Sequence, residues 1–160
     1  MKILCVILLF LNVELYAQDS LTIVHTLFYF GGSFCPHSVE PTNIANINSI
    51  RSNLPKIYPG TTFKFVLVVM DNNLQDGLKY ASNYPNWDEL SIGSFYNNEL
   101  MIAHVNQSAI PGVPHIMYYS DSLTIDKLGI PKIRKRTLLV DLVGESAIQK
   151  WIQDNYSIKK

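Results

Sequence analysis

The chain has 160 residues, which is enough for one domain with a substantial hydrophobic core. Hydrophobic residues make up 48% of it and charged residues only 16%. Its 13 basic and 13 acidic side chains cancel, so no global field draws it to nucleic acid or to an anionic membrane. The composition therefore predicts a globular domain without a nucleic-acid partner.

The first part of the chain differs in composition from the rest. Lys2 precedes an apolar stretch over residues 3–11, and a more polar region ends at Ala17. This pattern is typical of a secretory signal peptide over residues 1–17, which leaves residues 18–160 as a single mature domain. The apolar stretch is shorter than the roughly 20 residues that a membrane-spanning helix needs. We therefore expect an exported protein without stable membrane insertion after cleavage, located in a bacterial periplasm or, failing that, secreted.

The chain has two cysteines, and only one of them is expected in the mature protein. Cys5 lies inside the segment to be removed, so Cys35 remains alone. Disulfides persist in the compartments that exported proteins reach, but a single cysteine cannot form an internal one. Cys35 is therefore either a reactive or intermolecularly paired thiol, or a small buried hydrophobic residue.

The first half of the mature chain predicts a β-α-β unit. Residues 23–30 form a β-branched and aromatic run that ends at two glycines, which is typical of a strand inside a sheet. Residues 42–54 have apolar side chains at helical spacing and predict an amphipathic helix, which Pro55 and the pair Pro59-Gly60 end. Residues 61–70 form a second apolar strand. A strand, a helix and a strand in this order predict a parallel, right-handed unit.

The second half of the chain has a less regular pattern. The elements expected there, in chain order, are a helix over 74–82, an irregular connection over 84–98, a short helix over 99–105, a strand over 115–119, a turn over 120–122, a last strand over 137–143 and a helix over 145–155. Residues 123–136 have no assignment. Within them, residues 132–136 carry four positive charges, which indicates either a solvated strand end or a patch for a partner.

Cys35 stands where the first strand ends and a helix is expected to begin, in the sequence Cys35-Pro36-His37-Ser38. Unsatisfied N–H groups and the positive dipole end of a helix favour a thiolate over a thiol. His37 can add a positive charge or a hydrogen bond, and Ser38 can donate its O–H to the sulfur. We therefore expect Cys35, His37 and Ser38 to form the catalytic part of a site.

Two motifs together resemble those of thioredoxin-like proteins. In the first, the aromatic Phe30 stands five residues before Cys35, and Phe34 stands directly before it. The second is the segment 110–114, Ile-Pro-Gly-Val-Pro, which is similar to the family's segment that ends in a cis-proline before a strand. The spacing of 79 residues between Cys35 and Pro114 resembles the exported branch of the family.

This resemblance implies an α/β, thioredoxin-like fold. A central mixed sheet would be flanked by helices, in the order β-α-β and then β-β-α with an insertion between the two halves. A strand that ends at Asp71 also resembles the exported branch.

The chain departs from the family pattern at four places. Ser38 stands where the second active-site cysteine would be, and Pro41 is closer to Cys35 than the family's helix-kinking proline usually is. His115 follows the expected cis-proline where threonine is common. About seventeen residues separate the last two expected strands, where a tight hairpin would be usual.

The resemblance implies that Cys35 attacks a disulfide and forms a mixed disulfide with its substrate. Without a second cysteine, an external thiol or the substrate's own thiol must resolve that intermediate, or the intermediate persists. The first two outcomes give monothiol exchange or isomerisation, with protein or low-molecular-weight disulfides or thiols as partners. The third gives a redox-inactive module that holds an extended peptide or a partner beside Pro114.

The expected substrate contacts lie on both sides of the sulfur. They come from Phe34, Pro36, Val113 and Pro114. A cis-proline removes an N–H donor and leaves a flat backbone edge along which an extended substrate can lie. We expect a cis bond between Val113 and Pro114, in contact range of Cys35.

Sequence patterns for other kinds of site are weaker than those around Cys35. We expect no cofactor and no metal. The four histidines lack a close ligand pair, so a metal site would need the unusual set Cys35, His37 and His115. No phosphate-binding loop or Ser-His-Asp pattern is evident.

Overall fold

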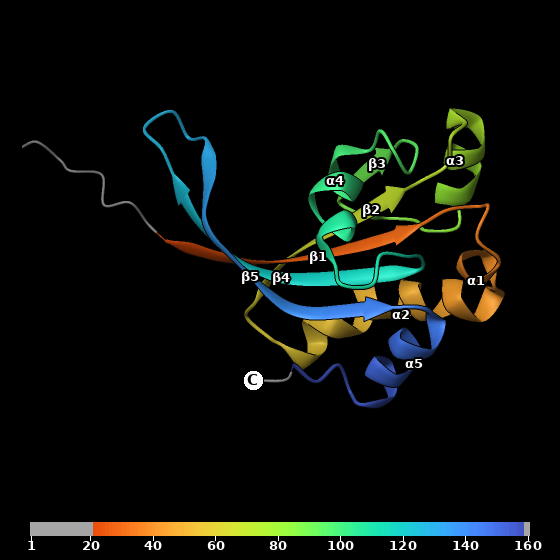
Figure 1. The fold of residues 1–160 in the computed structure, drawn as a ribbon. Helices are drawn as coiled ribbons and strands as arrows, with labels where there is room; N and C mark the ends of the chain where they lie inside the picture. Colours follow the sequence, from red (N-terminus) through yellow and green to blue (C-terminus); the bar gives the residue numbers. More distant parts are fainter. Residues whose placement is uncertain (1–20, 159–160) are drawn as a thin grey trace, which may run out of the picture.

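Residues 21–158 are described by a computed structural model, in which five strands form one sheet in the order β3-β2-β1-β4-β5 (Figure 1). The predicted signal peptide over residues 1–17, Cys5 and the predicted start of the mature domain at residue 18 lie outside the described residues. Within residues 21–158, none of the helices is both long enough and apolar enough to cross a membrane.

The first half of the fold is the predicted β-α-β unit. Its elements are β1 (Thr22–Gly31), α1 (Pro36–Val39), α2 (Pro41–Ile57) and β2 (Thr62–Val69). β1 and β2 are parallel, as the sequence predicts. The helix was predicted to end at Pro55 and the pair Pro59-Gly60; α2 continues past Pro55 and ends at Ile57, before Pro59. Pro55 lies in the last turn, where its missing N–H removes only one helical hydrogen bond.

The segment between the two halves holds more structure than the sequence predicts. It contains α3 (Leu74–Ala81), β3 (Glu89–Ile92), α4 (Glu99–Ala103) and a 3₁₀ turn, η1 (Val105–Gln107). β3 pairs in parallel with β2, so the expected irregular connection over 84–98 contains an edge strand. The Asp88 carboxylate accepts from the Phe65 N–H at 2.7 Å and joins the chain to β2 just before β3 begins.

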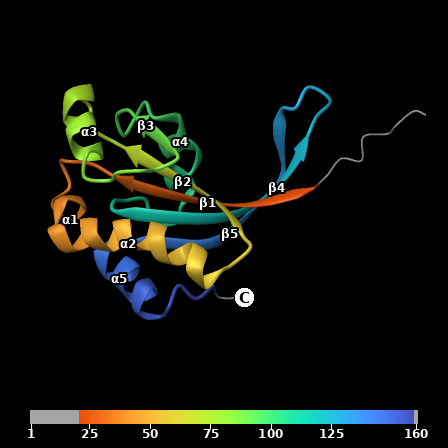
Figure 2. The same ribbon diagram turned by 180° about the vertical axis from the view of Figure 1, so that it is seen from behind.

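The last two strands, β4 (His115–Ile125) and β5 (Pro131–Val143), are longer than predicted. They pair in antiparallel register as far as Ile125 and Pro131, so the turn expected over 120–122 and most of the unassigned segment 123–136 are strand. The reversal is tight, because the Asp126 carboxylate accepts from the N–H groups of Leu128 and Ile130. The hairpin projects beyond the rest of the sheet (Figures 1 and 2).

Helices cover both faces of the sheet, and this arrangement is the predicted thioredoxin-like α/β fold (Figure 2). Leu27 and Tyr29 of β1 contribute to a core with α2 and with α5 (Glu145–Gln153). Phe28 and Phe30 point to the other face, where they form a second core with side chains of α4 and η1. β4 is antiparallel to β1, which completes the β-β-α half.

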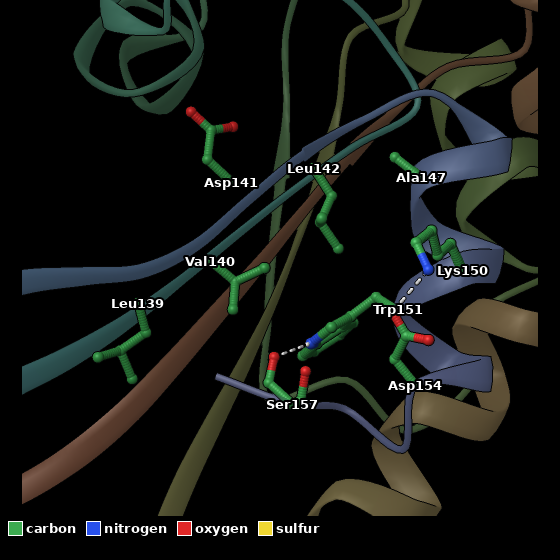
Figure 3. Close-up of a pocket in the computed structure, with 9 residues that line it drawn as sticks. All are labelled: Leu139, Val140, Asp141, Leu142, Ala147, Lys150, Trp151, Asp154 and Ser157. Carbon is green, nitrogen blue, oxygen red and sulfur yellow. Dashed lines mark hydrogen bonds and ion pairs between the residues drawn. The ribbon is translucent and has the colours of Figure 1, made fainter. Parts of the chain in front are cut away.

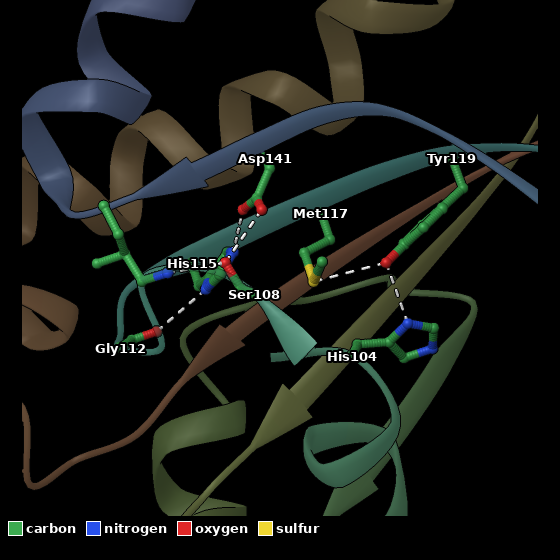
Figure 4. Close-up of polar contacts among 8 residues, drawn as sticks. His104, Ser108, Gly112, His115, Met117, Tyr119 and Asp141 are labelled. Carbon is green, nitrogen blue, oxygen red and sulfur yellow. Dashed lines mark hydrogen bonds and ion pairs between the residues drawn. The ribbon is translucent and has the colours of Figure 1, made fainter. Parts of the chain in front are cut away.

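A polar group, His104, is buried at the edge of the second core. Its Nδ1 lies 3.1 Å from the Tyr119 hydroxyl, which in turn donates to the Met117 sulfur (Figure 4). Its Nε2 lies 3.4 Å from the Arg136 guanidinium. Arginine can only donate, so Nε2 accepts and the ring is neutral. Burial, reinforced by the Arg136 charge and opposed by Asp121, lowers the pKa of His104 to about 4.

We predict that mild acid destabilises the fold through His104. The folded pKa is about 4, against 6.5 for the free side chain. The unfolded chain therefore binds the proton more readily, and the stability that depends on the neutral ring is lost as the pH falls from 6.5 towards 4. The free energy of unfolding should fall by on the order of 1–2 kcal/mol from neutral pH to about pH 4.5.

Urea unfolding at several pH values measures this effect, with His104→Gln as the matched variant. Gln does not titrate, so its stability should depend less on pH over this range. An equal pH dependence in both proteins would contradict the prediction.

Candidate functional site

Cys35 is partly exposed and lies between β1 and α1. Its N–H donates to the Gly32 carbonyl, and its own carbonyl accepts from the N–H groups of Ser38 and Val39 at 3.0 and 3.3 Å. It is therefore the N-cap residue of α1. However, α1 has only four residues and ends before Pro41, where α2 begins. The dipole that we expected to stabilise a thiolate at Cys35 therefore comes from a single helical turn.

The peptide bond between Val113 and Pro114 is cis, as the sequence predicts. The Cys35 Sγ lies 3.3 Å from the Val113 carbonyl oxygen, to which it donates. The expected proximity of the thiol and the cis-proline segment is therefore confirmed. Because a carbonyl can only accept, this hydrogen bond uses the proton of the thiol.

Asp71, at the end of β2, holds the loop that leads to Cys35. Its buried carboxylate accepts from the Ser33 N–H at 3.1 and 3.2 Å and also from the Ser33 hydroxyl. The sequence placed Asp71 at a strand end but did not identify it as part of the site. The signal was that strand end itself, since parallel neighbouring strands end at the same edge of a sheet.

Ser38 is fully buried and anchors α1 through its backbone. Its carbonyl accepts from the hydroxyls of Tyr80 and Tyr84 at 3.4 and 3.2 Å. Its own Oγ has no hydrogen-bond partner among the described residues, so the O–H donation to the sulfur that we expected is not made. Gly31 allows this packing, because a Cβ there would overlap the Tyr80 hydroxyl.

The two donors belong to a buried tyrosine cluster, made of Tyr29, Tyr80 and Tyr84. Their hydroxyls lie 3.0–3.3 Å from one another, and Asn43 donates to the Tyr29 hydroxyl at 3.1 Å. Burial raises the pKa of all three tyrosines, so the hydroxyls keep their protons at neutral pH. No local pattern in the sequence indicates this cluster, because Tyr29 lies in β1, Tyr80 in α3 and Tyr84 after α3.

The other predicted site residues lie at the surface around the sulfur. His37 is exposed, and its Nδ1 lies 3.7 Å from the Glu145 carboxylate of α5. Phe34 is exposed and lines a hollow of about 370 Å³ together with Phe95 and Tyr96. Pro36 is also exposed, at the start of α1.

His115, which follows the cis-proline, ties the preceding loop to β5 (Figure 4). Its Nε2 bonds to the Asp141 carboxylate, and its Nδ1 lies 3.3 Å from the Gly112 carbonyl. Ser108 donates to the other Asp141 oxygen at 3.0 Å. Both ring nitrogens therefore face acceptors, and the ring fixes the segment next to Val113.

The two histidines that could share a metal ion with the sulfur each lie beside a carboxylate. His37 faces Glu145 and His115 faces Asp141. Across residues 21–158, the His, Cys, Asp and Glu side chains form no group of three placed to hold a metal ion.

A separate hollow of about 300 Å³ lies between β5 and α5 (Figure 3). Leu139, Leu142 and Trp151 line it, and the Trp151 indole N–H is already bonded to the Ser157 carbonyl. Asp141 points to the opposite side of the strand in this view. None of the predicted site residues lines this hollow, so it is not part of the candidate site.

No protein-family model and no curated protein matches the chain. Solved structures with a similar fold include a thiol-disulfide oxidoreductase from Bacteroides fragilis NCTC 9343, at 20% identity over 81% of this chain and 80% of that one, with a TM-score of 0.43. StoA from Bacillus subtilis is 18% identical over 81% and 80% of the two chains, with a TM-score of 0.42. Tryparedoxin I from Leishmania major is 16% identical over 86% and 88%, with a TM-score of 0.41. At these values, the chemistry of the site has to be inferred from its own geometry.

We predict that Tyr80 and Tyr84 support α1 non-additively. Each single Tyr→Phe variant leaves the Ser38 carbonyl one donor, and should lower the free energy of unfolding by about 0.5–1.5 kcal/mol. The double variant leaves that buried carbonyl without a donor, and should cost a further 1–3 kcal/mol or so. It should also speed alkylation of Cys35, because α1 loses its anchor.

Urea unfolding of the two single variants and the double variant gives the coupling energy directly. Tyr96→Phe is the matched control, since Tyr96 is exposed. Strictly additive losses, with no change in alkylation, would show that the two hydroxyls do not share one acceptor.

Proposed function

We propose that this protein carries out monothiol thiol–disulfide exchange through Cys35, on protein or low-molecular-weight disulfides, after export directed by residues 1–17. The observation that carries the proposal is the position of the Cys35 thiol. It is partly exposed, and its sulfur lies 3.3 Å from the carbonyl of the residue that precedes a cis-proline. An exchange reaction needs an accessible sulfur, and the adjacent backbone edge gives an extended substrate a place to lie.

The reaction balances without a cofactor. The Cys35 thiol gives its proton to water, and the thiolate attacks one sulfur of the substrate disulfide. A bond forms between Cys35 and that sulfur, the substrate S–S bond breaks, and the other sulfur leaves as a thiolate. Ser38 cannot resolve the mixed disulfide, because a hydroxyl does not form one. An external thiolate of the glutathione class, or a second thiol of the substrate, attacks instead and releases Cys35.

The two routes of release have different net outcomes. Attack by the substrate's own thiol gives isomerisation, with no net change in oxidation state. Attack by one external thiol transfers the mixed disulfide to that thiol, and a second external thiol completes reduction of the substrate while the two external thiols become a disulfide.

The Val113 carbonyl would couple the chemistry to substrate binding. In the free protein it accepts from the Cys35 thiol. Once the sulfur has lost its proton and formed the mixed disulfide, this oxygen has no donor and is available to a substrate N–H. His115 and Asp141 would hold the carbonyl in place, while Phe34, Pro36 and the backbone beside Pro114 would contact the substrate.

A redox-inactive module that holds an extended peptide or a partner beside Pro114 is the second candidate function. The same hydrogen bond favours it, because ionisation of the sulfur removes the bond to Val113. The brevity of α1 favours it as well, since one helical turn offers limited stabilisation to a thiolate. The two functions differ in the reactivity of the sulfur.

We predict that Cys35 reacts with iodoacetamide at neutral pH at least about tenfold faster than the thiol of glutathione, as an activated thiolate does. The same protein should exchange with glutathione disulfide to give a mixed disulfide visible by mass spectrometry. Cys35→Ser is the control for both measurements. Alkylation as slow as that of glutathione, or slower, in a correctly folded protein would favour the binding module.

We predict that Ser38→Cys creates a dithiol that reduces insulin in the presence of a thiol reductant. The Ser38 Oγ is buried and unpartnered, so a thiol at this position gives up no hydrogen bond. The control is the double variant Cys35→Ala, Ser38→Cys, which should be inactive. If the folded single variant were as inactive as this control, the surrounding site would not support dithiol chemistry.

A further inference from the structure

The β4–β5 hairpin ends in an arm that extends past the rest of the sheet. We define the hairpin arm as residues 123–136. β1 and β4 pair as far as Thr22 and Leu123. Beyond that pair, β4 is bonded only to β5 among the described residues, and both views show the arm standing clear of the helices (Figures 1 and 2).

The end of the arm exposes large aliphatic side chains. Leu128, at the turn, is 83% exposed, and Ile133 is 52% exposed. Ile125 and Ile130 are also exposed. Single exposed apolar residues are ordinary, but four within nine consecutive residues form a patch, and patches mark interaction sites.

The same arm concentrates positive charge. Five of its residues are basic and only Asp126 is acidic. Asp126 pairs with Lys132 at 3.2 Å, and the Arg136 guanidinium is committed to the buried Asp121 on β4. Lys127, Arg134 and Lys135 form no ion pair within residues 21–158. The whole chain is neutral, so the other residues carry the balancing acidic excess.

We propose that the hairpin arm docks this protein on the surface of an anionic membrane. Leu128 and Ile130 would enter the interface between lipid headgroups and acyl chains, and the basic side chains would lie at the level of the lipid phosphates. Aliphatic side chains next to lysine and arginine are the combination that binds such interfaces. The attachment is peripheral, through one turn, and requires no spanning helix.

The shape of the arm favours a membrane over a protein partner. A stable protein interface buries at least about 1,000 Å², counted over both partners, and needs a complementary surface across that area. A fluid bilayer accepts a protruding tip without a matching groove. Lys127 stands beside Leu128 at the turn, and Arg134 and Lys135 lie four and five residues past Ile130 on β5. An arm that lies along the membrane surface brings all three groups to the level of the lipid phosphates, within the Debye length of about 8 Å at physiological salt.

Docking in this way would leave Cys35 facing away from the membrane. The arm lies beside the first residue of β1, whereas Cys35 follows the last. β1 has ten residues and therefore spans about 30 Å. The thiol would remain open to soluble substrates at the far end of the sheet. The docking itself does not depend on the chemistry of Cys35.

The first test places a reporter on the tip. The full chain with Leu128→Trp is mixed with vesicles of phosphatidylcholine and phosphatidylglycerol in equal parts, or of phosphatidylcholine alone. We expect the tryptophan emission to shift to the blue with the anionic vesicles only, and the shift to disappear at high salt. An unchanged emission, or an equal shift with the neutral vesicles, would overturn the proposal.

The second test removes the charge and the apolar tip separately, by vesicle co-sedimentation. The double variant Lys127→Glu, Lys135→Glu should bind anionic vesicles at least tenfold more weakly. Its control, Lys56→Glu with Lys79→Glu, makes the same change of charge at exposed lysines elsewhere. Equal weakening in the variant and the control would overturn the proposal.

Leu128→Asp should likewise weaken vesicle binding, in contrast to Leu74→Asp at a position that is 60% exposed on α3. Every variant keeps residues 1–20, so differences between them report on the arm.

Two further outcomes would overturn the membrane proposal, because they would show that the arm binds an acidic polypeptide or a second copy of this chain. One is arm-dependent binding to polyglutamate without binding to vesicles. The other is an arm-dependent dimer in sedimentation velocity.

Discussion

The last six residues of β1 are buried on both faces of the sheet. Leu27 and Tyr29 pack into one core, and Phe28 and Phe30 pack into the other. A strand without a polar face must be covered on both sides, so α2 and α5 are required below it and α4 and η1 above it. The chain can leave this buried environment only at the end of the strand. Cys35, which follows the end of β1, therefore lies at the edge of the sheet, where it is partly exposed to solvent.

Separate parts of the fold hold the thiol and its surroundings. Asp71 from β2 fixes the loop before Cys35, and Tyr80 and Tyr84 fix the carbonyl of Ser38 after it. The Val113 carbonyl approaches from the loop before β4, which His115 ties to β5. The sulfur sits where these contacts converge. A change in any one element would therefore alter the position of the thiol relative to the cis-proline segment.

The two surfaces for which we propose a function lie at opposite ends of the sheet. The thiol follows the last residue of β1, and the hairpin arm extends past the first. One rigid sheet can therefore separate an attachment surface from a reactive surface. Buried pairs such as Arg136 with Asp121 stiffen the base of the arm, because the guanidinium binds the carboxylate through two hydrogen bonds of 2.7 Å.

Much of the architecture could be predicted from local patterns. Helical spacing of Ile47, Ile50 and Leu54 and the apolar runs on either side identified the β-α-β unit, because one periodic stretch buries one face. The family motifs identified Cys35 and the cis-proline at Pro114. The strand β3 could not be predicted, because its four residues alternate polar and apolar over too short a run to indicate a strand, and they form one only by pairing with β2. The hairpin arm was missed for a related reason, since its exposed faces lack the pattern of a strand that covers a core.

The sequence by itself determined which cysteine is the candidate for reaction and that no second cysteine stands beside it, because those are matters of composition and spacing. Only the tertiary structure decided what surrounds the sulfur. The contacts of Tyr29 with Tyr80, of Ser33 with Asp71 and of His115 with Asp141 join residues from separate elements, which lie 51, 38 and 26 positions apart in the chain. Such contacts depend on how strands and helices pack against each other, and a local pattern in the sequence carries no information about that packing.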